Sequence, residues 1–153
     1  MLLLVFQLGT SRYALEAQAI SEVAPYARLE PIAQAPAYVA GLFDFRGELV
    51  PVIDLRHLVQ GQDCNRHMTS RIMLVDYPLP SGGQRLLGLL AEQVTETLKV
   101  NEDDFTSAGV HIEDTPYLGD IARDEKGMIH LLRSTQLLPE AVCRQLFAPA
   151  EPA

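Results

Sequence analysis

The chain has 153 residues, of which 48% are hydrophobic, so it is long enough for one domain or two small lobes with a shared core. Twelve basic side chains stand against twenty acidic ones, a net charge of −8, and no stripe of Lys or Arg offsets this balance. The charge excludes nucleic acid and anionic lipid as favoured partners, because their phosphate groups would be repelled.

The first ten residues, MLLLVFQLGT, are apolar but far shorter than the about 20 residues that a membrane span requires. They also lack the basic region and cleavage site of a signal peptide. The two cysteines, Cys64 and Cys143, do not indicate a disulfide framework. We therefore expect a cytoplasmic, soluble protein without direct membrane insertion.

Short apolar runs separated by turn residues predict strands, in chain order, at residues 2–8, 13–17, 48–55, 71–77, 85–94 and 127–133. Strands spaced this closely favour barrels or a sandwich over a sheet of alternating strands and helices. Residues 37–45 are expected to form a short helical turn. Residues 134–147 predict a C-terminal helix with Ser134 as N-cap, which Pro139 could either split or begin.

Residues that could support catalysis or bind a metal are scattered along the chain. Cys64 and His67, in the segment CNRH, could supply half of a zinc site, but no second pair has a matching spacing. The acidic runs at 101–104 and 112–115 do not match a calcium-binding loop, and no nucleophile or phosphate-loop motif is present. We predict no enzymatic activity, no metal and no cofactor. The alternative is a small metal- or ligand-binding β-barrel enzyme.

Residues 41–56, GLFDFRGELVPVIDLR, place an arginine–glycine pair between two apolar runs. Gly47 permits a tight turn with positive φ. Asp54 and Arg56, two residues apart, are expected on one face of a strand, where they can support loop hydrogen bonds. Arg46 is then either a clamp within its own loop or a contact for a partner, since a guanidinium group serves both purposes.

This stretch resembles the signature of the CheW-like family, the coupling proteins of bacterial chemotaxis arrays. Gly41, the Arg-Gly pair and the run VPVIDLR at 50–56 all match the signature. The likeness covers essentially the whole chain, including FQLGTSRYALEAQAISEV at 6–23 and LLGLLAEQV at 86–94. It implies a single domain over residues 1–153 with a mainly β fold: two small five-stranded SH3-like β-barrels packed side by side, with a hydrophobic seam between them and a short C-terminal helix.

The resemblance also implies what the protein does. In the family the matching arginine is associated with binding of the chemoreceptor tip, which implies a receptor-binding role for Arg46. Ile20 and Glu22 match other positions tied to receptor contact. The implied function is a non-enzymatic adaptor that couples methyl-accepting receptors to the regulatory domain of a CheA-type histidine kinase.

Three further residues, Arg71, Ile72 and Gly88, fall near positions that the family uses for the kinase. For Ile72 and Gly88, as for Ile20 on the receptor side, core packing is an equally compatible interpretation. A scaffold that binds only a kinase is a second alternative.

The sequence departs from the family pattern at a few positions. Phe43, Asp44 and Phe45 precede the Arg-Gly pair where small polar residues and Leu are common, and Asp44 could pair with Arg46. Glu92 replaces a usual Asp, and Arg133 replaces a frequent Asp or Asn. These departures favour a pathway-specific coupling protein, for example in surface sensing or biofilm control.

Overall fold

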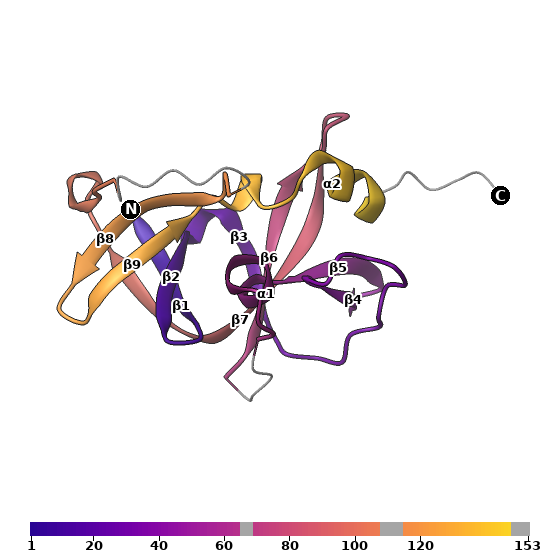
Figure 1. Ribbon diagram of the computed structural model, residues 1–153, viewed down its shortest axis with the longest axis horizontal. Helices are drawn as coiled ribbons and strands as arrows, with labels where there is room; N and C mark the ends of the chain where they lie inside the picture. Colours follow the sequence, from indigo (N-terminus) through magenta and orange to yellow (C-terminus); the bar gives the residue numbers. More distant parts are fainter. Residues whose placement is uncertain (65–68, 108–114, 148–153) are drawn as a thin grey trace.

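The computed structural model of the protein describes residues 1–64, 69–107 and 115–147. Strands dominate the fold and helices are short (Figure 1). In chain order the elements are β1 (Leu2–Leu8), β2 (Ser11–Glu16), the 3-10 helix η1 (Ala17–Ala19), β3 (Ile20–Pro25), β4 (Val39–Phe45), β5 (Glu48–Asp54), α1 (Leu55–Gln60), β6 (Arg71–Pro78), β7 (Gln84–Lys99), η2 (Glu102–Asp104), β8 (Leu118–Asp124), β9 (Gly127–Leu132), η3 (Ser134–Gln136) and α2 (Glu140–Leu146).

The strands form two barrels of five strands each, which share β7. Barrel 1 contains β1, β2, β8, β9 and the second half of β7, whereas barrel 2 contains β3, β4, β5, β6 and the first half of β7. In Figure 1 barrel 1 lies on the left, barrel 2 lies on the right, and α2 sits beside β6. The predicted pair of side-by-side barrels with a short C-terminal helix is confirmed.

Strand β7 passes from one barrel to the other at Glu92. Residues up to Ala91 pair with β6, while Glu92 and residues 96–99 pair with β1. The neighbouring Gln93 has a φ of 47°, and the register of β1 against β7 shifts between Val5 and Gln7. An irregularity of this kind bends a strand and increases its twist, which lets one strand serve two sheets.

Three hydrophobic cores hold the structure together. Each barrel has its own small core, around Val52 and Leu74 in barrel 2 and around Leu3 and Ile129 in barrel 1. The largest cluster joins the barrels, because it combines Phe6 and other buried residues of barrel 1 with buried residues of barrel 2. The seam that the family resemblance implied is therefore a continuous packed interface.

Two of the predicted helical segments differ in the structure. Residues 39–45 form β4 instead of a helical turn, since this segment pairs along its whole length with β5. Pro139 splits the C-terminal segment into η3 and α2, and it is itself the N-cap of α2. None of the helices within the three described ranges is long and apolar enough to cross a lipid bilayer.

A half-buried ion pair ties the β8–β9 hairpin to β2. The two terminal nitrogens of Arg12 each donate a hydrogen bond of 2.7 Å to the carboxylate of Asp124. This bidentate contact, opposed in part by burial, holds the pKa of the Asp124 carboxyl at about 2, below its ordinary value of 3.8. The charged form is therefore the one that the fold stabilises.

The sign of this shift predicts an acid-sensitive contribution to stability. The pair stabilises the fold at neutral pH, and the contribution is lost as the pH falls from about 4 towards 2, where Asp124 becomes protonated. Asp124→Asn should lower the thermal midpoint at pH 7 and have little effect near pH 2. Thermal unfolding across this range measures the difference, with Asp120→Asn on the same strand as a control. A difference that did not change with pH would contradict the assignment.

Candidate functional site

The β4–β5 hairpin presents Arg46 at its tip. Arg46 and Gly47 have φ values of 52° and 85°, which are the left-handed conformations that a two-residue type I′ hairpin turn requires. The side chain of Asp44 accepts a 2.9 Å hydrogen bond from the backbone N–H of Gly47 and so stabilises the turn. Asp44 thus binds the turn backbone, and the predicted alternative that it pairs with Arg46 is not what the structure shows.

The structure brings Arg46 together with Glu22, which lies 24 residues earlier on β3. One guanidinium nitrogen of Arg46 lies 2.8 Å from a carboxylate oxygen of Glu22, and the guanidinium carbon lies 4.7 Å from the centre of the Phe45 ring. The two interpretations of Arg46 are compatible, because the side chain clamps the hairpin to β3 and is still 73% exposed. The clamp is weak, since exposed ion pairs stabilise by about 0–1 kcal/mol.

Most donors of Arg46 remain available for another molecule. Within the described part of the chain, Glu22 is the one side chain that pairs with this guanidinium group. A planar fork with five N–H donors can therefore keep its contact to Glu22 and bind a carboxylate or carbonyl of a partner as well. We call Glu22 and Arg46 the Arg46–Glu22 edge of barrel 2.

Ile20 lies on the same strand as Glu22 but has a different environment. It is half-buried and packs against the seam core. The core-packing interpretation therefore holds for part of the Ile20 side chain. The exposed part of this side chain lies beside the Arg46–Glu22 edge on β3. The structure therefore places all three predicted receptor-binding residues on neighbouring elements of barrel 2.

Two exposed apolar side chains near this edge were not expected from the sequence. Val23 follows Glu22 and is 40% exposed, while Leu49 follows the Arg-Gly turn and is 61% exposed. In the sequence both look like ordinary members of apolar strands. Their outward orientation follows from the pairing registers of β3 and β5, which the residue pattern did not determine. Exposed apolar side chains on the same strands as a cation with spare donors are typical of a protein-binding surface.

The predicted kinase-binding residues separate into one surface residue and two core residues. Arg71 begins β6 and is half-buried, with its guanidinium donating to the carbonyl of Ser70. Ile72 is fully buried. A β-carbon on Gly88 would lie 2.9 Å from a methyl group of Val52 and 3.0 Å from one of Ile72. A partner could contact the Ile72 side chain only if this side chain were exposed. The burial of Ile72 and the tight space at Gly88 therefore favour the core-packing interpretation for both residues.

Arg71 lies on the same pair of strands as the Arg46–Glu22 edge. In the antiparallel β3–β6 ladder Glu22 is opposite Leu74, and Pro25 is opposite Arg71. Pro25 lies three residues after Glu22 along the extended strand, a distance of about 10 Å. The two candidate contact regions are therefore close together and connected by backbone hydrogen bonds.

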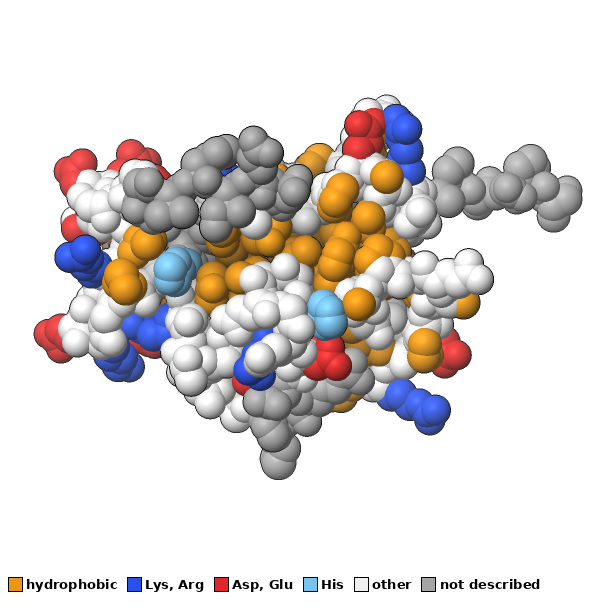
Figure 2. Space-filling model, viewed as in Figure 1, with side chains coloured by type: hydrophobic (Ala, Val, Ile, Leu, Met, Phe, Trp, Pro, Cys, Tyr) orange, Lys and Arg blue, Asp and Glu red, His pale blue; other side chains and the backbone are white. Residues whose placement is uncertain are grey.

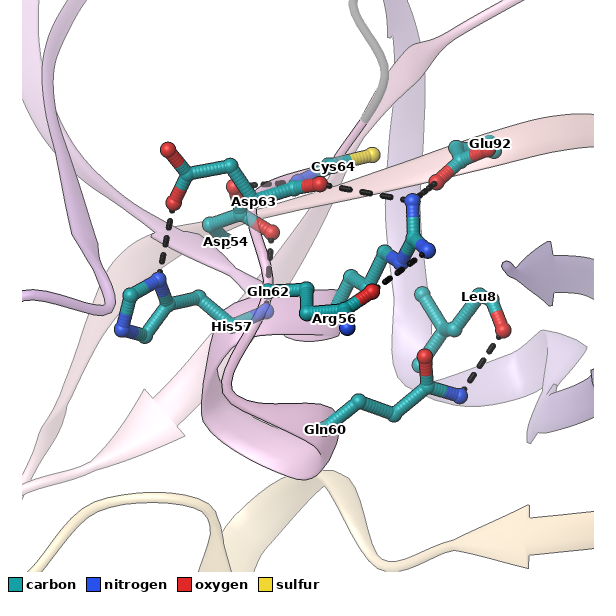
Figure 3. A network of polar contacts seen from close by, with 9 residues as sticks. All are labelled: Leu8, Asp54, Arg56, His57, Gln60, Gln62, Asp63, Cys64 and Glu92. Atoms are coloured by element: carbon teal, nitrogen blue, oxygen red, sulfur yellow. Dashed lines mark hydrogen bonds and ion pairs between the residues drawn. The ribbon is translucent and has the colours of Figure 1, made fainter.

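The end of the signature forms a polar network around α1 and the end of β5 (Figure 3). Asp54 is the N-cap of α1, and its carboxylate accepts hydrogen bonds from the backbone N–H groups of His57 (3.1 Å) and Cys64 (2.9 Å). The expected arrangement of Asp54 and Arg56 on one strand face is wrong, because β5 ends at Asp54 and Arg56 belongs to the helix. The expected support of a loop by Asp54 is confirmed.

Arg56 connects α1 to the strand that both barrels share. Its guanidinium group donates to the side chain of Gln62 (3.0 Å) and contacts the buried carboxylate of Glu92 (3.4 Å), at the point where β7 changes barrels. Glu92, which departs from the family pattern, therefore helps to fix the junction. The network therefore has a structural role. It connects α1 to β7, the strand that joins the two barrels.

Cys64 belongs to this network through its backbone N–H. Burial, together with the nearby Asp54 and Glu92 carboxylates, raises the pKa of the Cys64 thiol well above its ordinary range and keeps it protonated. Among the residues that the structure describes, no three His, Cys, Asp or Glu side chains form a metal-binding group. The structure does not describe residues 65–67 of the CNRH segment or residues 112–114 of the second acidic run. A zinc site or a calcium site at these two segments is therefore not tested.

Apolar side chains also gather along the seam on one face of the molecule. Figure 2 shows them across the middle of the molecule, between the two barrels and towards α2. Partly buried residues of the seam core include Tyr38, Leu58 and Leu138, from three different segments. The family resemblance implied a hydrophobic seam between the barrels, and apolar side chains that reach the surface along such a seam are typical of protein-binding sites.

Comparisons with known proteins agree with this architecture. The crystal structure of the scaffolding protein TtCheW from Thermoanaerobacter tengcongensis is similar with a TM-score of 0.78 and 25% identity, over 89% of this chain and 86% of that one. The chemotaxis protein CheW of Rhizobium meliloti is 27% identical over 122 residues, which are 80% of this chain and 69% of that protein.

Two further relatives align over a shorter part of their length. The chemotaxis protein CheW of Klebsiella aerogenes is 26% identical over 105 residues, and that of Treponema pallidum is 27% identical over 117 residues. Each alignment covers 69% of this chain, but only 60% and 61% of the two relatives. The family profile described as CheW-like domain matches residues 2–142. The chain therefore belongs to the CheW-like domain family.

Proposed function

We propose that the protein is a non-enzymatic adaptor of chemosensory signalling. It binds the cytoplasmic tip of a methyl-accepting receptor and the regulatory domain of a CheA-type histidine kinase, and it acts in the cytoplasm at receptor arrays. Membership of the CheW-like family and the likeness to proteins named for chemotaxis and scaffolding support this proposal.

The observation that carries the proposal is the exposed guanidinium group of Arg46, at the tip of a hairpin whose strand β5 also exposes Leu49. Arg46 has donors to spare, its ion pair with Glu22 is weak enough to be shared with a partner, and Val23 and Leu49 supply apolar contact area. Such an edge binds an elongated surface that carries both carboxylates and apolar side chains, which is what a receptor coiled coil offers. The receptor contact is assigned to Arg46, Glu22 and the exposed part of Ile20.

The kinase contact is assigned to Arg71, with Ile72 and Gly88 shaping the sheet beneath it. Because Arg71 and Glu22 lie on the same strand pair, a receptor on one side and a kinase on the other would be held at a fixed separation. Two modest interfaces linked in this way raise the effective concentration of each partner without any new contact. The protein makes or breaks no covalent bond in this role.

Reconstitution from three components tests the function. Receptor-containing membranes, the histidine kinase and this protein are mixed, and co-sedimentation and kinase autophosphorylation are measured. The proposal predicts that the kinase sediments with the membranes, and responds to the receptor, only when this protein is present. Binding to the kinase alone would indicate a kinase-only scaffold, and stoichiometric zinc in the purified protein would revive the metal-enzyme alternative.

We also propose that the adaptor serves one particular pathway. Phe45 and Asp44, which depart from the family pattern, hold Arg46 and its turn in place. These residues shape the proposed receptor edge and so are placed to discriminate between receptors. Pull-down with tips from several receptors measures this, and equal recovery of all of them would refute pathway specificity.

A further inference from the structure

A pocket between the β6–β7 hairpin and α2 is separate from the Arg46–Glu22 edge. It has a volume of about 670 Å³, and its apolar walls include Leu79, Pro80 and Phe147. Phe147 is 7% exposed and its ring stacks on Tyr77 with 6.4 Å between the ring centres, so this wall is fixed. A pocket of this size accommodates one or two large side chains of a ligand.

The charge at the pocket contrasts with the charge of the protein. The chain as a whole carries a net charge of −8, yet among the described residues that line the pocket the charged ones are Arg85 and Arg144. Arg85 is exposed, its guanidinium lies 5.8 Å from the centre of the Phe147 ring, and within the described ranges it forms no ion pair. The cation and the apolar wall therefore face the same space.

Arg144 adds a second cation whose present partner is easily exchanged. It pairs with Glu140 one turn earlier on α2, and both side chains are more than 60% exposed. Exposed ion pairs at this helical spacing are weak, so a ligand carboxylate can compete with Glu140 for the guanidinium group.

We propose that this hairpin–helix pocket binds an acidic and hydrophobic segment of a protein partner. A large apolar side chain would enter between Leu79, Pro80 and Phe147, and a flanking carboxylate would bind Arg85, with Arg144 available to a second one. Two cations in the lining of one apolar pocket fit a peptide that carries carboxylates next to its apolar residue. The proposal does not depend on the identity of the partners described above.

The test is a titration of the full chain with a fluorescent hexapeptide, Glu-Glu-Leu-Phe-Glu-Glu, followed by fluorescence anisotropy. Saturable binding is expected, and the peptides Lys-Lys-Leu-Phe-Lys-Lys and Glu-Glu-Gly-Ser-Glu-Glu should bind far more weakly. Arg85→Glu should weaken binding of the acidic peptide by about tenfold, as expected for loss of a charge contact at an interface. Arg85→Lys should retain most of the binding, because it keeps the charge.

Arg123→Glu is the matched control, since it makes the same charge change at an exposed position of β8 in barrel 1. Unchanged binding in Arg85→Glu, or an equal loss in Arg123→Glu, would overturn the proposal. So would binding of laurate in place of the peptide, since that would indicate a lipid site. Peptide binding that appears only in a variant ending at Phe147 would assign the pocket to the chain's own last residues. Peptide binding that appears only on dilution of the protein would assign it to a second copy.

Discussion

Replacing Gly41 with alanine should reduce the free energy of unfolding by about 2–4 kcal/mol. Gly41 has a φ of 145°, a conformation that alanine rarely adopts, and a β-carbon at this position would lie 2.6 Å from the carbonyl oxygen of Glu30. This carbonyl accepts a 2.7 Å hydrogen bond from the N–H of Leu42. The substitution therefore forces the two backbone segments apart and disrupts the base of the hairpin that carries Arg46.

Gly47→Ala is the matched control for this prediction. Gly47 also has a positive φ, 85°, but no atom lies within 4 Å of the position that a β-carbon would occupy. Its replacement adds backbone strain alone and should cost about 1 kcal/mol. Urea unfolding of the two variants measures the difference. Equal losses would mean that the close approach to Glu30 has no energetic importance.

Reversing the charge of Arg46 should weaken binding to a receptor tip by at least about tenfold while leaving the fold intact. Arg46→Glu places a carboxylate opposite Glu22 and removes the guanidinium donors that the hairpin tip offers to a partner. Stability should change little, because the side chain is 73% exposed and its ion pair is weak. Affinity for a soluble receptor fragment and the thermal midpoint are measured on the same preparations.

Two further variants separate a partner contact from a local clamp. Arg46→Gln removes the charge without adding a repulsive one and should show an intermediate loss of affinity. Arg123→Glu, at an exposed position of barrel 1, changes the charge of the protein equally and should bind the receptor normally. A normal affinity of Arg46→Glu would remove Arg46 from the receptor contact and leave it as a clamp of its own hairpin.

Local sequence patterns predicted those strands whose own residues determine their structure. The apolar runs at β1, β6 and β9 identify these strands without any knowledge of their neighbours. Strand β4 was missed, because its small and mixed residues acquire a strand conformation only through pairing with β5. The length of β7 was also missed, since its second half is defined by pairing with β1 in the other barrel.

The candidate site was predicted in part, by resemblance more than by pattern. The Arg-Gly turn was identified from the sequence, but its contact with Glu22 joins residues 24 positions apart and needs the barrel to bring them together. Asp54 looked like the next residue of an apolar strand, whereas its role as a helix cap ends that strand. The burial of Ile72 could not be distinguished from surface contact until the packing of Gly88 against it was known.

NMR mapping of the receptor contact shows whether the Arg46–Glu22 edge binds the receptor tip. A 15N-labelled sample of the protein is titrated with an unlabelled receptor tip, and the amide signals are followed residue by residue. We expect the signals of Glu22, Arg46 and Gly47 to shift or broaden first, with those of neighbouring β3 residues. Changes confined to barrel 1, with β3 and the β4–β5 hairpin unaffected, would contradict it.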